Sequence, residues 1–512
     1  MAAHLDLADV LVVVAYLATI LGMSAYIARR QHTGYEYFLA GRAMPGSLLA
    51  MSIIANQASA ISLIGAPAFV ALRVGGGLAW LQYELALPLA MLAAMVLLLP
   101  ALRSVTGPSI YEYAERRFGP GTRRMLAAAF LLSRGLALGV ALYASAIVVS
   151  AALGWRLDLA IVAIGVFALA YTSLGGIVAD IWSDVVQLIL LWGGTLAGAG
   201  FLLVRHGRDV LSAIPSARIR VVVPGWGVGP EGTFEFWPML IGGLFLYISY
   251  YACDQSQAQR LLTARTDGEA RKALLFNGLL RFPLVLSYCI LGLLLAGLMA
   301  SDPGFAARLV DRPPDSLVPT FMMEYLPGGL RGLMFAGLLA AAMSSIDSAM
   351  NSLAAVTIED VFRRNPSQQP AWVGRLTSVG WGLFSVGSAM AFARTGAGVL
   401  ELVNLIGSAF YGPILAVFVL GVATTGVGSR GAVSGLVGGL VANVLLSQLA
   451  PSLSWLWWNP AGFVAAVVAA LVVTREPVRL VRPSWPVREG RWLIGAFAAM
   501  LLTLVMLPAL MS

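Results

Sequence analysis

The stretch that decides the fold reads Ala341-Ala342-Met343-Ser344-Ser345-Ile346-Asp347-Ser348-Ala349-Met350-Asn351-Ser352. It follows an apolar run, so we expect it inside a membrane helix, with its hydroxyls on or near one face. Asp347 and Asn351 lie one turn apart beside that face. Polar groups at bilayer depth are costly unless they meet a partner or a water-filled cavity. Their oxygens suit a small cation without its hydration shell. The stretch therefore predicts an ion or solute site, with close helix packing of Ser and Ala as the alternative.

The whole chain has the composition of an all-α polytopic membrane protein. Of its 512 residues, 59% are hydrophobic and only 11% are charged. The three histidines, His4, His32 and His206, are far apart and lie at a terminus or in loops, so they offer no metal-ligand spacing. No segment is long enough for an appended catalytic domain. We therefore expect neither an enzyme nor a nucleic-acid partner.

The apolar runs predict about fourteen membrane spans. The basic residues indicate how these spans are oriented in the membrane, because the loops predicted to be inside hold about twice as many Lys and Arg as the outside loops. Arg260 is counted with the inside loops in this comparison. We expect an integral protein of the bacterial plasma membrane with its N-terminus outside. The outside loop 205–234 does not fit this orientation, since it is unusually rich in Arg. The predicted spans are 6–28, 47–72, 80–103, 124–152, 158–177, 180–204, 235–260, 272–300, 329–356, 370–393, 398–422, 431–450, 455–474 and 489–511.

Two of these spans are interrupted by polar residues. Span 47–72 contains Asn56, Gln57, Ser59 and Ser62, and span 235–260 contains a similar polar break. Two broken spans separated by four others are typical of an inverted five-helix repeat. Broken helices also expose backbone carbonyls that can bind cations. The alternative is ordinary small-residue packing with a proline kink.

Four motifs, taken in order, resemble the sodium/solute symporter family. They are Ser59-Ala60-Ile61-Ser62-Leu63-Ile64-Gly65-Ala66-Pro67; Tyr171-Thr172-Ser173-Leu174-Gly175-Gly176 followed by Trp182-Ser183-Asp184-Val185-Val186-Gln187; Asp254-Gln255 with Gln259-Arg260-Leu261-Leu262-Thr263-Ala264; and the opening stretch continued to Val361. The resemblance implies a LeuT-type fold with two inverted five-helix repeats. The expected parts are a leading helix and inside loop (1–46), a first repeat (47–204), an outside loop (205–234), a second repeat (235–422) and trailing helices (423–512).

The resemblance also implies sodium sites. The ligands of the main site would be the carbonyls of Ala55, Ala58 and Ala341 with the hydroxyls of Ser344 and Ser345. Some members carry a second sodium, whose matching positions here are Asp184, Ser344, Asp347 and Ser348. This chain has a carboxylate at position 347 where that branch has Ser, which could strengthen a cation site or bind a proton instead.

Matching positions imply a solute site as well. Arg281 matches a lysine that contacts the solute in the sugar branch, and Arg134 lies about one turn from an arginine that binds a carboxylate in the sialic acid branch. Either could grip an anion, or could instead pair with Glu84, Asp254 or Glu401 or extend to an interface. The full set of expected solute-binding residues is Asn56, Gln57, Ser59, Ser62, Gln82, Glu84, Arg134, Tyr247, Tyr250, Arg281 and Asn404.

The function implied is sodium-coupled import of a small polar organic solute by alternating access. The partners would be sodium, the solute and membrane lipid, and a monomer would suffice. The solute could be a carboxylate, a sugar or an amino acid. A proton-coupled carrier of the same fold is the alternative, in which Asp184 and Asp347 would titrate.

Overall fold

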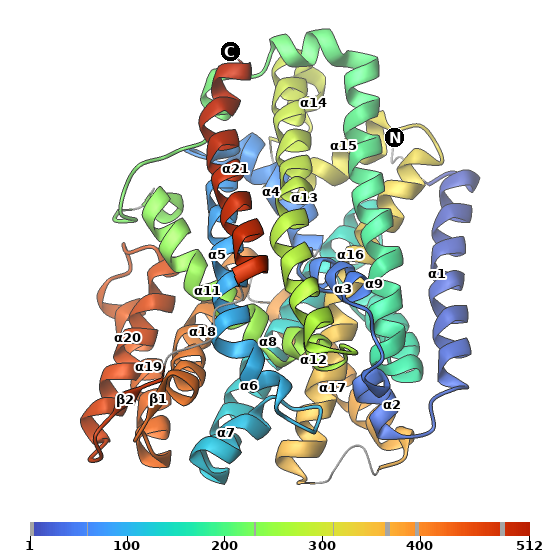
Figure 1. Cartoon of the computed structure of the whole chain (residues 1–512). Helices are drawn as coiled ribbons and strands as arrows, with labels where there is room; N and C mark the ends of the chain where they lie inside the picture. The colour runs from blue at the N-terminus through green and yellow to red at the C-terminus, as the bar shows by residue number, and fades with distance from the viewer. Residues whose placement is uncertain are drawn as a thin grey trace.

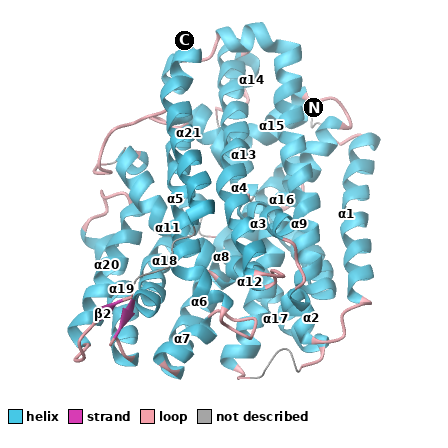
Figure 2. Cartoon of the chain, viewed as in Figure 1, coloured by secondary structure: helices cyan, strands magenta, loops and turns pink. Residues whose placement is uncertain are grey.

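The chain is built almost wholly of helices (Figure 2). The computed structural model describes residues 5–58, 60–229, 232–310, 312–363, 369–394, 399–481 and 487–511. Among these residues, 11 helices are long and apolar enough to cross a membrane, or up to 12 if a bent pair counts as one span. The other predicted spans correspond to two shorter apolar helices, 157–170 and 238–252. The all-α membrane class is confirmed, while the total of fourteen spans stays a prediction.

The elements of the first half lead from the N-terminus to the loop predicted to be outside. They are α1 (Leu7–Ala28), α2 (Gly34–Leu39), η1 (Ala40–Arg42), α3 (Gly46–Gln57), α4 (Ala60–Leu72), η2 (Gly77–Leu85), α5 (Ala86–Ala93), the π-helix η3 (Ala94–Leu98), α6 (Leu99–Arg103), α7 (Tyr111–Phe118), α8 (Pro120–Leu153), α9 (Leu157–Ser212) and α10 (Ser216–Ile219).

The second half contains η4 (Gly232–Phe234), the π-helix η5 (Pro238–Gly242), α11 (Gly243–Ala252), α12 (Gln255–Leu262), α13 (Asp267–Ser301), α14 (Pro303–Ala307), η6 (Pro314–Ser316), α15 (Leu317–Tyr325), α16 (Leu330–Val356) and the π-helix η7 (Thr357–Val361). It continues with α17 (Ala371–Ala393), α18 (Val399–Ala423), β1 (Thr424–Thr425), α19 (Ser429–Leu449), η9 (Trp455–Trp457), α20 (Trp458–Val473), β2 (Arg479–Leu480) and α21 (Val487–Met511). β1 and β2 form a short antiparallel ribbon.

Both ends of the chain lie at the same end of the molecule. Figure 1 shows the N- and C-termini at the top with α14 and α15, whereas α2, α7 and the β ribbon lie at the bottom. An even number of crossings returns a chain to the side on which it started. The arrangement is therefore the one that the predicted topology requires.

Two helices break inside the membrane region, as the sequence predicts. α3 and α4 are bent by 55° relative to one another around Ala58. α11 ends at Ala252, and Asp254 then caps α12 by accepting a hydrogen bond from the backbone N–H of Ser256. Each break leaves backbone groups outside the helical pattern, which creates polar sites within an apolar bundle.

α9 contains the two predicted spans 158–177 and 180–204. Gly176 separates them with φ 56° and ψ −157°, a conformation that favours glycine. A side-chain carbon at this position would also approach the Tyr37 carbonyl oxygen to 2.6 Å. The glycine therefore permits both the turn and the close contact.

α1 is held against α16 by a buried carboxylate. Asp9 is fully buried and lies 2.6 Å from Arg331 Nε. It also accepts hydrogen bonds from the backbone N–H groups of Gly329 and Gly332, at 2.9 and 2.7 Å. Most of α1 faces outward, and this contact ties its N-terminal end to α16, while α1 also packs against α9.

We predict that Asp9→Asn loosens α1, because the variant loses the charge that faces Arg331. The expected loss is about 1–3 kcal/mol of stability, read as a lower apparent Tm in detergent. The control is Asp158→Asn, whose partner Arg156 is 84% exposed and whose loss should leave Tm unchanged. Equal Tm values for both variants and the wild type would contradict the assignment.

Candidate functional site: a helix break, a buried charge cluster and a cavity

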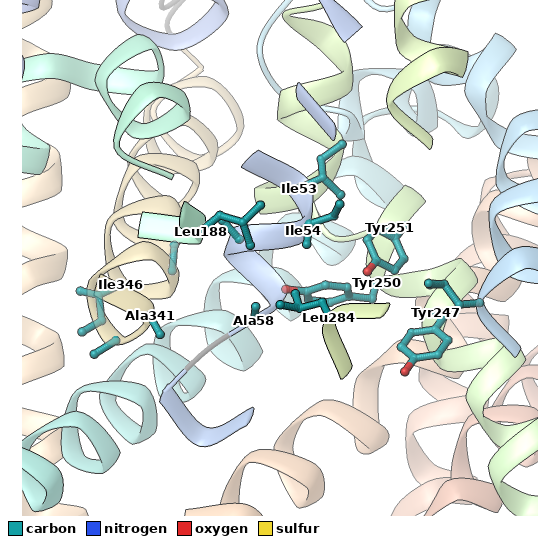
Figure 3. Close-up of a cluster of buried hydrophobic side chains, with 14 of the residues drawn as sticks. Ile53, Ile54, Ala58, Leu188, Tyr247, Tyr250, Tyr251, Leu284, Ala341 and Ile346 are labelled. Carbon is teal, nitrogen blue, oxygen red and sulfur yellow. The ribbon is translucent and has the colours of Figure 1, made fainter. Parts of the chain in front are cut away.

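The predicted main sodium residues come from neighbouring segments. The carbonyls of the last turn of a helix have no partners within that helix, and α3 ends immediately before Ala58. Ser345 of α16 donates a hydrogen bond to the Asn56 carbonyl oxygen at 3.0 Å. Figure 3 shows Ala58 at the break and Ala341 on α16, which packs against α3 and α4. The fold thus brings residues far apart in sequence to one place.

The two serines of this region have different partners. Ser345 bonds to the helix break, whereas the Ser344 hydroxyl donates to the Asp184 carboxylate. These two adjacent serines of α16 thereby connect the break with a second polar group, which lies between α9 and α16. That Ser344 is a ligand of both sodium sites stays a prediction.

A fully buried arginine holds that second group together. Arg260 of α12 has no exposed surface. Its Nη2 donates to Asp184 at 2.7 Å, to Asp180 at 3.0 Å and to Ser348. Its Nε donates to the Ser52 hydroxyl at 2.7 Å. Arg260, which the topology prediction counts with an inside loop, thus lies in a helix in the protein interior and not in an exposed loop.

A third carboxylate completes the buried charge cluster, which we define as Asp180, Asp184, Asp347 and Arg260. Oxygens of the three buried carboxylates lie within 4.8 Å of one another. Asp347 also accepts a hydrogen bond from the Ser348 backbone N–H at 2.7 Å. When all three acids are ionised, one guanidinium leaves an excess of negative charge. A cation or a proton would balance it.

A cavity of about 270 Å³ lies beside the helix break. Ser345 lines it, so the cavity and the predicted main sodium region share a residue. Most of its other walls are apolar or aromatic. The predicted solute-binding residues that line it are Asn56, Gln57, Ser62, Arg134, Tyr247, Tyr250 and Arg281.

Several buried polar atoms in the cavity wall have no hydrogen-bond partner within the described part of the chain. Such atoms are usually satisfied by a ligand or by water. They offer a bound solute both donors and acceptors. They are both amide atoms of Asn56, Gln57 Oε1, Arg134 Nε, the Tyr288 hydroxyl and the Ser408 hydroxyl.

The two predicted anion-binding arginines differ in how fully they are paired. Arg281 Nε lies 2.9 Å from the carboxylate of fully buried Glu84, which also accepts a hydrogen bond from the Tyr247 hydroxyl at 3.1 Å. Arg134 lies 3.9 Å from Asp254, beyond hydrogen-bonding distance. The charge of Arg134 is therefore the less compensated of the two.

Four further predicted residues do not contribute a described side chain to the cavity wall, and one of them is Glu84, which is fully buried beside Arg281. Gln82 Nε2 donates to the Phe234 carbonyl at 2.7 Å, and its Oε1 accepts from the Val223 N–H at 3.2 Å, so it ties down the loop that follows α10. Ser59 and the side chain of Asn404 lie outside the described residues. Their assignment to the solute site stays a prediction.

Sequence reasoning missed Asp180 and the interior position of Arg260. The signal for Asp180 was its spacing, four residues before Asp184 on one helix, which places both carboxylates on the same face. Arg260 could not be placed from spacing alone, because its partners come from α3, α9 and α16.

Comparison with known proteins shows the class and the family to which this protein belongs. The profile described as "Sodium:solute symporter family" matches residues 37–439. The protein is thus a sodium-dependent membrane transporter and not an enzyme. It belongs to the sodium:solute symporter family.

Curated relatives cover most of the chain. A "Putative sodium-dependent multivitamin transporter" of Drosophila melanogaster is 29% identical over 84% of this chain and 72% of its own length. "Sodium-coupled monocarboxylate transporter 1" of Xenopus laevis is 28% identical over 82% and 68%. The "Sodium/iodide cotransporter" of Homo sapiens is 27% identical over 84% and 67%. Sodium is thereby confirmed as the coupling ion, and the proton-coupled alternative finds no support.

A solved structure shares the fold. The substrate-bound outward-open state of a sodium-coupled sialic acid symporter superposes with a TM-score of 0.81 at 23% identity, covering 93% of this chain and 100% of that one. The LeuT-type class of fold is confirmed. The inverted repeats and their boundaries stay predictions.

We predict that Arg260→Gln destabilises the protein strongly, because it leaves Asp180 and Asp184 without their cation. Removing one partner of a buried ion pair costs about 3–5 kcal/mol. Adding Asp180→Asn should restore part of the loss, since the pair then carries less uncompensated charge. The measurement is the apparent Tm of both variants.

The matched control is Arg308→Gln, which removes an ion pair whose arginine is 53% exposed. Its Tm should equal that of the wild type. A double variant less stable than Arg260→Gln alone would show that the two side chains do not interact as described.

Proposed function

We propose that the protein imports a small organic carboxylate together with sodium, with Arg134 as the group that binds the carboxylate. The observation that carries this proposal is the buried, unpartnered Nε of a loosely paired arginine in the cavity wall. An arginine fork matches the two oxygens of a carboxylate. Among the relatives, two printed names include a monocarboxylate and iodide, both of which are anions.

The coupling sodium is proposed to sit at the main site, bound by the carbonyls of Ala55, Ala58 and Ala341 and the hydroxyls of Ser344 and Ser345. The hydrogen bond from Ser345 to the α3 break supports this placement, because it shows that the two ligand groups can approach one another. Since Ser345 also lines the cavity, sodium and the anionic solute would attract each other across a short, poorly screened distance.

A second sodium is proposed at Asp184, Ser344, Asp347 and Ser348, within the buried charge cluster. The excess of carboxylates over guanidinium groups supports it. Asp180 and Arg260 would act there as fixed neighbours that adjust the local charge. Two sodium ions with one monoanion would carry net positive charge inward.

The parts that move are proposed to be the five-helix repeats 47–204 and 235–422, flanked by 1–46, 205–234 and 423–512, in a chain whose N-terminus is outside. Sodium would favour the outward-facing state, because there both groups of ligands can meet the ion. An inside-negative membrane then drives uptake by about 2.3 kcal/mol per charge per 100 mV.

A thermal-shift screen tests the solute class. The purified protein is heated with monocarboxylates, sugars and amino acids, each with sodium and with N-methyl-D-glucamine in its place. We expect stabilisation by carboxylates that depends on sodium. Stabilisation by uncharged sugars alone would reject the carboxylate assignment and leave the sodium coupling intact.

We predict that Ser345→Ala raises the sodium concentration for half-maximal uptake by about tenfold, the cost of one lost hydrogen-bonding group of roughly 1.4 kcal/mol. Ser352→Ala, in the same helix but bonded to the Ser348 carbonyl, serves as the control and should keep the wild-type sodium dependence. Uptake by proteoliposomes over a sodium series gives both values. Unchanged sodium dependence in Ser345→Ala would remove this residue from the main site.

We predict that Arg134→Gln abolishes binding of the carboxylate identified in the screen, whereas Arg281→Gln weakens it less. Arg281 is already neutralised by Glu84 at 2.9 Å, so its loss should act mainly on stability. Equilibrium binding and Tm, measured on both variants, separate the two effects. Full carboxylate affinity in Arg134→Gln would defeat the assignment.

A further inference from the structure

Six aromatic rings form a continuous row, and all of them except Tyr251 line the cavity. Centroids of successive rings lie 4.9–6.2 Å apart in the order Phe234, Trp80, Tyr83, Tyr247, Tyr251 and Tyr250. Phe234 ends η4 and is the last residue of the predicted outside loop 205–234, while Tyr250 lies beside Arg134. The row therefore connects the outer end of the cavity with the proposed carboxylate site.

Three arginines lie over rings of this row. Arg134 lies over Tyr250 at 6.0 Å and Arg281 over Tyr247 at 5.6 Å, both within the cavity. Arg73 lies over Phe234 at 4.5 Å. Arg73 is exposed and follows α4 directly, so it marks the outer end of the same series.

A second arginine adjoins this end. The Arg218 guanidinium donates a hydrogen bond to the carbonyl of Arg73. Within the described residues, no carboxylate lies within 4.0 Å of the Arg218 side chain. Arg218 belongs to the Arg-rich loop whose charge opposes the predicted topology. Gln82 bonds both Val223 and Phe234 and so holds the end of that loop at Phe234, which lines the cavity.

We infer that Arg73 and Arg218 form an outer anion site, which collects the anionic solute at the mouth of the cavity and passes it over Phe234. This inference rests on the proposed carboxylate solute. One exposed and one half-buried arginine bind an anion weakly, but a basic patch at the mouth of a pocket raises the anion's local concentration and its association rate by roughly 10–1,000-fold. Salt screens such an effect over about 10 Å. The excess of Arg on this loop then has a function in solute capture.

The first arm of the test measures the local potential without any solute. Val74, next to Arg73, is 76% exposed, and the two native cysteines are buried. The variant Val74→Cys is treated with an anionic methanethiosulfonate (ethylsulfonate) and, separately, with a cationic one (ethyltrimethylammonium). The rate of the anionic reagent divided by that of the cationic reagent should be higher in Val74→Cys than in the same protein carrying Arg73→Gln and Arg218→Gln as well. We expect the ratio of the two rates to fall about 5–10-fold in that background.

The second arm measures uptake of radiolabelled pyruvate, far below saturation, into phosphatidylcholine proteoliposomes. Sodium is fixed, and ionic strength is varied with N-methyl-D-glucamine chloride. The Arg73→Gln/Arg218→Gln variant should be about 3–10-fold slower than the wild type at low ionic strength and should converge with it at high ionic strength. Arg156→Gln, a change at an exposed arginine elsewhere on the molecule, should match the wild type throughout.

The outcomes of the two arms distinguish a failure of the outer anion site from a failure of the carboxylate assignment. An unchanged ratio of modification rates, or equal uptake at every ionic strength, overturns the outer anion site alone. A changed ratio without pyruvate uptake by the wild type rejects the solute role of the site together with the carboxylate assignment. If phosphatidylglycerol vesicles abolish the difference in the ratio, the arginines bind a lipid headgroup and the solute role is again rejected.

Discussion

Arg260 carries a full charge inside the bundle, where an unpaired charge costs several kcal/mol. Its guanidinium meets carboxylates of α9 and hydroxyls of α3 and α16 while the residue itself belongs to α12. Four helices are thereby fixed around one group. Because the acids outnumber the arginine, the same cluster that holds the helices together is where we propose the second sodium. On that proposal, stability and ion binding depend on the same buried charges.

α16 links this cluster to the helix break and to the cavity. Ser344 faces Asp184, and the adjacent Ser345 faces the carbonyl of Asn56 and lines the cavity wall. A movement at the break would therefore change the cavity wall through one helix. If sodium and solute bind where we propose, this short connection gives a physical basis for their coupling, since the ion would join α3 to α16 next to the solute.

The helical membrane class, the two breaks and the polar face of α16 could be predicted from sequence, because hydropathy and polar interruptions are local signals. Most predicted solute residues do lie around one cavity. The interior position of Arg260 could not be predicted, since its partners are supplied by three other helices. Likewise, Arg281 and Arg134 look equivalent as isolated residues in apolar runs. Only the distances to Glu84 and Asp254 distinguish a closed ion pair from a cation with spare hydrogen-bonding capacity.

The central claim is that sodium and solute occupy one connected site, and thermodynamic linkage tests it most directly. The measurement is the equilibrium affinity of the purified protein for its carboxylate solute across a sodium series at constant ionic strength. The account predicts that affinity rises with sodium and levels off once the sites are filled, and that the solute raises sodium affinity by the same factor. A solute affinity that is independent of sodium would contradict it.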